Sequence, residues 1–467
     1  MPVSFNRCWV RSCAAVGAFL VAGWLTSTLH AQTRNYPLRL SSDGTHLTDQ
    51  SNQPFFINGE AAWSLIAALS REDAELYLEN RRLKGFNLVL VSLIEHQFSP
   101  NYPANYYGQQ PFATAGNFIT PNEGYFAHAD WVINKAAEKG IVVLLAPIYL
   151  GYQCGGQGWC AEVKASSQAS MRSYGRYLGL RYRNFANVVW LIGGDTDPVA
   201  NGVAGKLQEV VAGIKENDTV HLMSAHNAPE QAGRDPWPNE SWLNLNSIYT
   251  YGNSYAKAIE QFNRTPFMPF YLLETYYENE HGSTPFTLRR QAYWDVLAGG
   301  ILGHIFGNCQ IWGFGYGFCS SSWKSQLESA GSQTIAHVGR LFRSRAFPKL
   351  RPDQNHNVLT NGFQTGDTLA LAGRATDGST VIAYIPTSRT VTIDLRQLAG
   401  IAARAWWFNP RTAGATLVGD YPTTGQASFV PPDQNDWVLV LDNASLNLSA
   451  PGGDAAPAAP TNIRIIR

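Results

Sequence analysis

Residues 70–92 read SREDAELYLENRRLKGFNLVLVS and carry the pattern of one helix followed by one strand. Ser70 stands before the helical stretch as an N-cap, and Asp73 follows three residues later, a carboxylate variant of the capping box. Gly85 occupies a position where a helix ends. The apolar run Leu88–Ser92 then has the length of a buried strand. This unit predicts a helix that leads directly into a strand of an α/β fold.

The alternation of strands and helices continues on both sides of this unit, from about Phe55 to Phe306. The strand candidates are Pro54–Asn58, Leu88–Ser92, Val142–Pro147, Val188–Ile192, His221–Ser224, Ser247–Tyr249, Phe270–Leu273 and Gly303–Phe306. The helix candidates between them are Arg71–Lys84, Phe126–Lys139, Ser166–Arg183, Gly205–Asn217 and Leu288–Ala298. Eight strands separated by helices predict a parallel sheet closed as a (β/α)8 TIM barrel, which we place at residues 36–350. Because the segments after the fifth and sixth strands are weakly helical, an open doubly wound sheet remains the alternative.

After a long helix candidate, Lys324–Arg345, the pattern changes to short strands separated by turn residues. These strand candidates are Leu369–Gly373, Val381–Ile385, Val391–Leu395, Ala403–Phe408, Thr416–Val418, Ala427–Val430 and Trp437–Asp442. The pair Asp377-Gly378 between two of them is a hairpin signal. Short strands at this spacing predict an antiparallel β-sandwich over residues 352–443. The Pro/Ala/Gly-rich residues 444–467 are expected to form a flexible tail.

The composition indicates a folded protein without a nucleic-acid partner. Of 467 residues, 45% are hydrophobic and 15% are charged, as in globular proteins. The 35 Lys and Arg balance 35 Asp and Glu, so no basic excess exists to bind a phosphate backbone. The aromatic content of 12% fits a carbohydrate-active protein, which uses aromatic faces against sugar rings, although ordinary core aromatics explain it equally well.

The N-terminus carries an export signal. Arg7 and Arg11 precede a short apolar run from Cys13 to about Leu25, and Ala31 offers a small residue for cleavage. This arrangement is typical of a secretory signal peptide, residues 1–31, and the run is too short for a membrane span. We therefore expect a secreted or periplasmic protein that does not associate with the membrane after cleavage.

The four cysteines outside the signal peptide form two local pairs, Cys154 with Cys160 and Cys309 with Cys319. Four cysteines permit three connectivities, and an oxidising compartment favours two disulfides that close short loops. A zinc site is the alternative, but the sequence contains neither a C-x-x-C pair nor an H-E-x-x-H motif. We expect neither a metal nor an organic cofactor.

Two carboxylates stand out because a barrel enzyme places its site at the C-terminal ends of its strands. Asp195 follows the apolar run Val188–Ile192 and two glycines, and Glu274 follows the seventh strand. These strands lie on opposing sides of a barrel mouth, so the carboxylates can face each other across a substrate. Two carboxylates that flank one bond are the minimum requirement of a glycosidase. Taken singly, they could be a helix cap and a surface glutamate.

Other polar and aromatic residues at the strand ends are candidate sugar contacts. They are Glu60, Trp63, Glu95, His96, Tyr149, Asp197, His226, Tyr251 and Trp312. His96 and His226 could instead be structural histidines. Asp197 is the second candidate for the acid/base, and its place before Pro198 suggests that it could simply organise its loop.

Four stretches resemble the apiosidase-like glycoside hydrolase family. They are residues 55–63 (FFINGEAAW), 84–87 (KGFN), 190–198 (WLIGGDTDP) and 273–278 (LETYYE). The resemblance covers roughly Tyr36 to Asp442 and implies a (β/α)8 catalytic domain followed by a β-sandwich labelled as collagen-binding. It also implies that Asp195 is the acid/base and Glu274 the nucleophile. The family more often has Asp where Glu60 stands. The resemblance does not identify the sugar.

We therefore expect an exported, monomeric glycoside hydrolase that acts on a plant or microbial polysaccharide side chain by a retaining mechanism. This mechanism calls for a solvated, hydrogen-bonded Glu274 and a less polar environment for Asp195. Inversion is the alternative stereochemistry, because the short Asp195 side chain lengthens the gap between the carboxylates. The rival from another class is a non-catalytic exported protein that binds polysaccharide or collagen.

Overall fold

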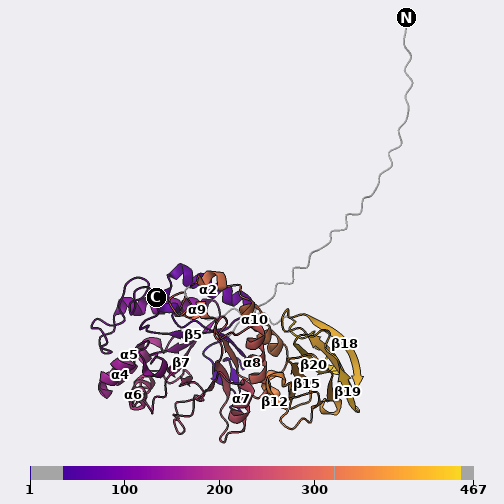
Figure 1. Cartoon of the computed structure of the whole chain (residues 1–467). Helices are drawn as coiled ribbons and strands as arrows, with labels where there is room; N and C mark the ends of the chain where they lie inside the picture. Colours follow the sequence, from indigo (N-terminus) through magenta and orange to yellow (C-terminus); the bar gives the residue numbers. More distant parts are fainter. Residues whose placement is uncertain (2–34, 320, 454–467) are drawn as a thin grey trace. The chain divides into compact units, whose positions relative to one another are not determined.

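The computed structural model describes Met1 and residues 35–319 and 321–453 (Figure 1). The predicted signal peptide lies outside residues 35–453. Within the described part of the chain, no helix has the length and apolar character needed to cross a membrane.

Eight parallel strands form one sheet in the order β8-β7-β6-β5-β4-β11-β10-β9. They are β4 (Ile57–Ala61), β5 (Leu88–Ser92), β6 (Val142–Ala146), β7 (Val188–Gly193), β8 (Met223–His226), β9 (Asn246–Tyr249), β10 (Phe270–Glu274) and β11 (Gly303–Phe306). The end strands β8 and β9 meet through a parallel bridge between Ser224 and Leu245. Ser247 Oγ strengthens this contact by donating to the carbonyl of Ala225 at 2.6 Å. The predicted barrel is therefore confirmed, and the open doubly wound sheet is excluded.

Helices follow most of the strands. They are α1 (Leu65–Ala68), α2 (Arg71–Lys84), α3 (Glu123–Glu138), α4 (Cys160–Ala165), α5 (Gln168–Tyr182), α6 (Ala204–Lys215), α7 (Ser254–Asn263), α8 (Pro285–Leu297), α9 (Cys309–Trp312) and α10 (Ala330–Arg343). Helix α2 starts and ends as its sequence predicts: Ser70 Oγ accepts from the Asp73 amide at 3.2 Å, and Gly85 has a φ of 85°. Of the two segments with a weak helical pattern, residues 227–245 between β8 and β9 contain no helix, whereas the segment after β9 forms α7.

The first barrel strand lies three residues later than predicted. Pro54–Phe55 (β3) belongs to a small antiparallel sheet with β1 (Arg39–Leu40) and β2 (Leu47–Thr48), and the barrel strand is Ile57–Ala61. The apolar run from Phe55 to Ile57 continues from one sheet into the other, so it contains no internal sign of the boundary.

The C-terminal part is built from two antiparallel sheets, as predicted. One sheet has the order β12-β14-β15-β20-β17-β18 and the other β13-β16-β19. The strands are β12 (Leu350–Pro352), β13 (Leu359–Asn361), β14 (Leu371–Ala375), β15 (Thr380–Ile385), β16 (Val391–Asp394), β17 (Ala402–Phe408), β18 (Ala415–Pro422), β19 (Gln426–Phe429) and β20 (Trp437–Asn443). In Figure 1, β15, β18 and β20 appear in the orange to yellow part of the chain. Strand β12 pairs with β14, so the sandwich sheet begins at Leu350.

Buried polar contacts join the barrel helices to the sandwich. Arg289 of α8 forms an ion pair with Asp436 at 2.9 Å, and Arg345, just after α10, forms one with Asp442 at 2.7 Å. The Tyr293 ring of α8 stacks on Tyr384 of β15 with a centroid distance of 4.6 Å. Since all of these side chains are buried, the contacts fix the sandwich against the barrel.

The residues after β20 pack against the end of α10. Arg340 donates to the carbonyl of Gly452 at 3.1 Å, and Arg345 donates to that of Ser449 at 3.0 Å. The segment that we expected to be flexible from residue 444 is thus held in place at its start, and residues 454–467 lie outside the described part.

Candidate active site

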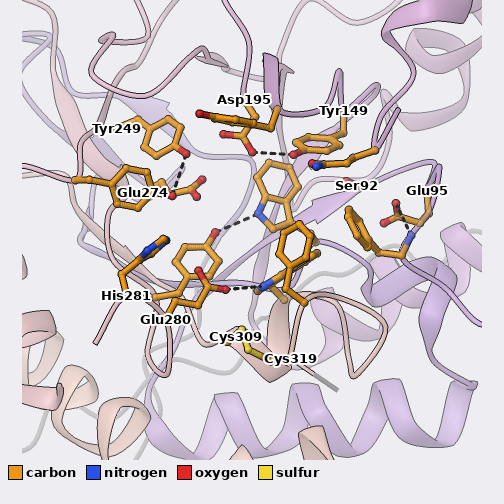
Figure 2. Close-up of a pocket in the computed structure, with 18 residues that line it drawn as sticks. Ser92, Glu95, Tyr149, Asp195, Tyr249, Glu274, Glu280, His281, Cys309 and Cys319 are labelled. Atoms are coloured by element: carbon orange, nitrogen blue, oxygen red, sulfur yellow. Dashed lines mark hydrogen bonds between the residues drawn. A yellow bond between two sulfur atoms is a disulfide. The ribbon is translucent and has the colours of Figure 1, made fainter. Parts of the chain in front are cut away.

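A cavity of about 440 Å³ opens at the C-terminal ends of the barrel strands (Figure 2). Its walls combine carboxylates with aromatic rings. The lining residues are Trp63, Ser92, Glu95, Phe98, Tyr149, Tyr152, Gln157, Asp195, Tyr249, Tyr251, Glu274, Tyr277, Glu280, His281, Cys309, Trp312, Phe318 and Cys319. The cavity is within the size range of small-ligand sites.

Glu274 is the last residue of β10 and is 7% exposed. Its Oε2 lies 3.3 Å from Nε2 of the buried His226 at the end of β8. Burial raises the pKa of the Glu274 carboxyl above its ordinary value, and Asp195 adds to this while His226 opposes it. Burial lowers the pKa of His226, but Glu274 and Asp195 together raise it above its ordinary value. Because both pKa values are raised, the Glu274–His226 pair loses its proton at a higher pH than an isolated glutamate does.

Asp195 is brought into the cavity by an unusual turn after β7. Gly194 has a φ of +154°, and a Cβ there would meet Tyr149 Cδ2 at 2.5 Å, so the turn requires glycine. Asp195 itself has a φ of 55°, in the left-handed region, a conformation that costs free energy and is concentrated at functional sites. The Tyr149 hydroxyl donates to Asp195 Oδ2 at 2.7 Å, and burial raises the pKa of Tyr149, which keeps it protonated as a donor.

The two carboxylates lie close together. One oxygen of Asp195, one oxygen of Glu274 and one ring nitrogen of His226 are all within 4.8 Å of one another. A histidine and two carboxylates are also a donor set that a divalent cation could use. Figure 2 shows both carboxylates turned into the same cavity, with Tyr149 and Tyr249 beside them.

Aromatic rings form the rest of the wall. Trp63 packs against Tyr149 with a centroid distance of 5.2 Å and stacks on His226 at 5.5 Å. Its Nε1 donates to the Tyr277 hydroxyl at 3.2 Å. Tyr249 and Tyr251 also line the cavity, and their hydroxyls are 3.2 Å apart. Rings that are fixed in this way can pack against the C–H faces of a sugar.

Both local cysteine pairs are disulfides, and each closes a loop at the cavity. Cys309 and Cys319 line the cavity themselves. Cys154 and Cys160 close the loop that carries the lining residues Tyr152 and Gln157. The disulfides therefore limit the movement of loops that shape the cavity.

Most of the predicted site residues meet at this cavity. Those that line it are Trp63, Glu95, Tyr149, Asp195, Tyr251, Glu274 and Trp312, and His226 lies directly behind Glu274. Glu95 has little capacity left for a ligand, because its carboxylate accepts from Ser64 Oγ at 2.8 Å and from the backbone amides of residues 96–98.

Glu60 does not reach the cavity. Its side chain is fully buried and accepts from Arg81 Nη2 at 2.9 Å and from the Tyr77 hydroxyl at 2.6 Å, both on α2. Side chains alternate along a strand, and this residue of β4 faces the helix layer instead of the barrel mouth. Glu60 is therefore one half of a structural ion pair, and its prediction as a sugar contact is wrong.

His96 and Asp197 also lie outside the cavity. His96 Nε2 is 3.2 Å from Glu162 Oε1, in a separate hollow. Asp197 Oδ1 accepts from the backbone amides of Val199 and Ala200, both at 2.9 Å, and Oδ2 accepts from Gln231. Asp197 thus organises its own loop, which was the alternative that its position before Pro198 suggested.

The sequence predicts that Glu274 is more exposed to solvent than Asp195, but the structure shows the opposite. Glu274, expected to be solvated, is buried, whereas Asp195 is half-buried and hydrogen-bonded to Tyr149. The reason is that Glu274 is still part of its strand, while Asp195 lies two residues beyond β7.

Strand-end reasoning missed several lining residues in the loops. Glu280 lies six residues past the end of β10, and it is half-buried and accepts a hydrogen bond from Trp312 Nε1 at 3.1 Å. Burial raises its pKa. Asn279 and His281 on either side of it have positive φ values, so the loop turns back toward the cavity. A signal existed in the turn-forming sequence Asn279-Glu280-His281-Gly282.

A TIM barrel with two facing carboxylates in an aromatic cavity at the strand ends has the features of the glycoside hydrolase class. Residues 41–349 match the family described as "Apiosidase-like, catalytic domain". Residues 352–442 match a second family, described as "Putative collagen-binding domain of a collagenase". Since the first match covers more than half of the 467 residues, the chain belongs to the apiosidase-like family and is a glycoside hydrolase.

Solved structures agree with this class. A structure of a glycoside hydrolase is 25% identical with a TM-score of 0.78, and the match covers 88% of this chain and 97% of that chain. A glycoside hydrolase family 5 structure from Bacteroides vulgatus ATCC 8482 shares the fold at 24% identity and a TM-score of 0.80, covering 92% of this chain and 98% of that chain. No curated protein matches the sequence.

Proposed function

We propose that this protein is an exported, retaining glycoside hydrolase that removes a neutral sugar from a plant or microbial polysaccharide side chain. The observation that carries the proposal is the short distance, within 4.8 Å, between oxygens of Asp195 and Glu274. Retaining enzymes hold their carboxyl groups about 5–5.5 Å apart, whereas inverting enzymes need about 6.5–9.5 Å to admit a water molecule. Two carboxylate oxygens this close to each other leave little room for a water molecule between the groups, which favours retention.

In the proposed first step, a Glu274 oxygen attacks the anomeric carbon while Asp195 gives its proton to the departing glycosidic oxygen. A glycosyl ester on Glu274 results, and the aglycone alcohol leaves. In the second step, Asp195 takes a proton from water, whose oxygen attacks the anomeric carbon and releases Glu274. The Tyr149 hydroxyl, which donates to Asp195 Oδ2, orients Asp195 for both proton transfers.

His226 reconciles the burial of Glu274 with a nucleophilic role. A carboxyl group in an apolar site favours its neutral form, which suits an acid better than a nucleophile. The imidazole of His226, 3.3 Å from Glu274 Oε2, opposes this effect and favours the carboxylate. We assign His226 as a positioning residue that keeps Glu274 ionised.

The charge of the cavity favours a neutral sugar. Glu95, Asp195, Glu274 and Glu280 all line it, and among the described lining residues there is neither a lysine nor an arginine. The carboxylate of a uronic acid would find no cationic side chain among these lining residues and would lie near the ionised nucleophile Glu274, in a partly desolvated cavity where like charges repel strongly. A neutral glycoside carries no such cost.

Turnover of plant-wall oligosaccharides and aryl glycosides tests the proposal, with each neutral sugar paired with its uronic acid analogue. We expect release of a neutral monosaccharide, no turnover of the paired uronide, and the same rate with a chelator present. Turnover that depends on a divalent cation would instead indicate that Asp195, His226 and Glu274 bind a metal ion. Failure to release any sugar would contradict the proposed function.

The pH dependence should reveal the Glu274–His226 pair. Glu274 must be ionised to act as the nucleophile, and its pKa is raised. The apparent pKa of the acidic limb of the kcat/KM profile should therefore be higher than the ordinary glutamate value of 4.5. His226→Gln removes a group that lowers the pKa of Glu274, so the limb should move to still higher pH. His281→Gln, a change at the histidine that lines the cavity itself, should leave the limb in place. A limb that moved to lower pH in His226→Gln would contradict the positioning role.

A further inference from the structure

A second hollow of about 480 Å³ lies on the same face of the barrel. Its walls come from two loops, one between β5 and α3 and the other between β6 and α5, which includes α4. The first loop contributes His96 and Tyr102, and the second contributes Gly156, Trp159 and Glu162. None of these residues lines the catalytic cavity.

The hollow combines a polar pair with an aromatic surface. His96 Nε2 and Glu162 Oε1 are 3.2 Å apart, and about a quarter of each side chain is exposed, 24% and 29%. The edge-to-face contact with the buried Trp159, at a centroid distance of 4.7 Å, fixes the His96 ring. Tyr102 is 60% exposed. A donor and acceptor beside an exposed phenol ring suit a sugar, whose hydroxyls and C–H face need both kinds of surface.

The hollow and the cavity share their walls. Along one loop, Glu95 and Phe98 line the cavity while the residues between them, His96 and Gln97, line the hollow. Along the other loop, Gly156 lines the hollow and the next residue, Gln157, lines the cavity. Figure 2 shows Glu95 at the edge of the cavity, on the side away from Glu274.

The second loop is also held firmly to the catalytic centre. The Cys154–Cys160 disulfide encloses Gly156, and the backbone amide of Gln153 donates to the carbonyl of Asp195 at 3.0 Å. A ligand in the hollow would therefore be bound at a fixed position relative to the carboxylate pair.

We propose that this hollow is a second sugar subsite, which binds a unit of the glycan other than the one whose anomeric carbon reacts. The inference rests on the proposed function, because it assumes a glycan substrate that extends beyond the reacting sugar. Its ligand class is a neutral sugar ring that packs on Tyr102 and hydrogen-bonds to the His96–Glu162 pair.

Two kinds of substrate separate the subsite from the catalytic cavity. An aryl glycoside with one sugar fills only the cavity, whereas a plant-wall oligosaccharide that releases the same sugar extends further. Tyr102→Ala and Glu162→Gln should each raise KM for the oligosaccharide about tenfold, the effect of losing one good contact. Both variants should leave kcat/KM for the aryl glycoside within about twofold of the unmodified enzyme, since neither residue lines the cavity.

A third variant fills the hollow without removing a contact. A Cβ on Gly156 would meet no atom within 4 Å, and its φ is outside the left-handed region, so Gly156→Met adds a long side chain to the wall without strain. Gly425→Met, at an equally open glycine in the turn between β18 and β19, is the matched control. Only Gly156→Met should raise KM for the oligosaccharide.

The outcomes are distinguishable from those of the proposed function. An unmodified enzyme that released sugar from neither substrate would overturn the proposed function and the subsite with it. Normal sugar release with unchanged oligosaccharide KM in all three variants would overturn the subsite alone. Equal losses on both substrates would also overturn it, because they would place these residues in the catalytic step.

Discussion

Glu274→Ala and Asp195→Ala are each expected to lower kcat roughly 10³-fold or more, because each removes a group that acts on the reacting atoms. The fold should survive both changes. Burial already works against the charged form of Glu274, so its removal relieves an unfavourable interaction. Glu280→Gln, at a third carboxylate of the same cavity, is the matched control and should change kcat far less.

Azide rescue distinguishes the two roles. With an activated aryl glycoside, azide should enter the space left in Glu274→Ala and give a glycosyl azide of inverted configuration. In Asp195→Ala the glycosyl ester still forms, so azide should give a product of retained configuration. If Glu274→Ala gave the retained azide and Asp195→Ala the inverted one, Asp195 would be the nucleophile and Glu274 the acid/base. A loss in Glu280→Gln as large as in Glu274→Ala would place the chemistry on a different carboxylate.

Arg345→Met is expected to lower the free energy of unfolding by about 3–5 kcal/mol, because it leaves the buried Asp442 without its cationic partner. Arg345 donates to both Asp442 oxygens, at 2.9 and 2.7 Å. Within the described part of the chain, Thr380 also donates to Asp442, and its side chain is neutral. Arg345 follows α10 of the barrel and Asp442 lies in β20 of the sandwich. The substitution should therefore weaken the contact between barrel and sandwich.

Urea denaturation measures this effect. Arg404→Met is the control, because it breaks a partly exposed pair with Asp420 on the sandwich surface and should cost at most about 1 kcal/mol. Equal losses in the two variants would show that the junction contributes no special stability. A large loss of stability in Arg345→Met alone would support a structural role for the sandwich.

Elements with strong local patterns were predictable from the sequence. Strand β5 and helix α2 have the predicted bounds, since β5 is a well-marked apolar run and α2 has clear capping residues. The first barrel strand was misplaced because its boundary depends on pairing with β5 and β11, which are distant in sequence. Local patterns contain no information about such pairing.

The same limit applies to the site. The rule that barrel enzymes act at strand ends led to Asp195 and Glu274, and the structure places both in one cavity. It could not decide whether Glu60 faces the barrel mouth or the helices, because a small shift in the start of a strand reverses its faces. Glu280 and the second hollow belong to loops, where no periodic pattern indicates the direction of a side chain.

Proton NMR of the sugar first released by the unmodified enzyme tests the central claim most directly. The two carboxylate oxygens within 4.8 Å of each other predict that this sugar has the same anomeric configuration as the substrate and later mutarotates. A first-formed sugar of the opposite configuration would contradict the account, because Glu274 would then act as a base on water instead of as a nucleophile.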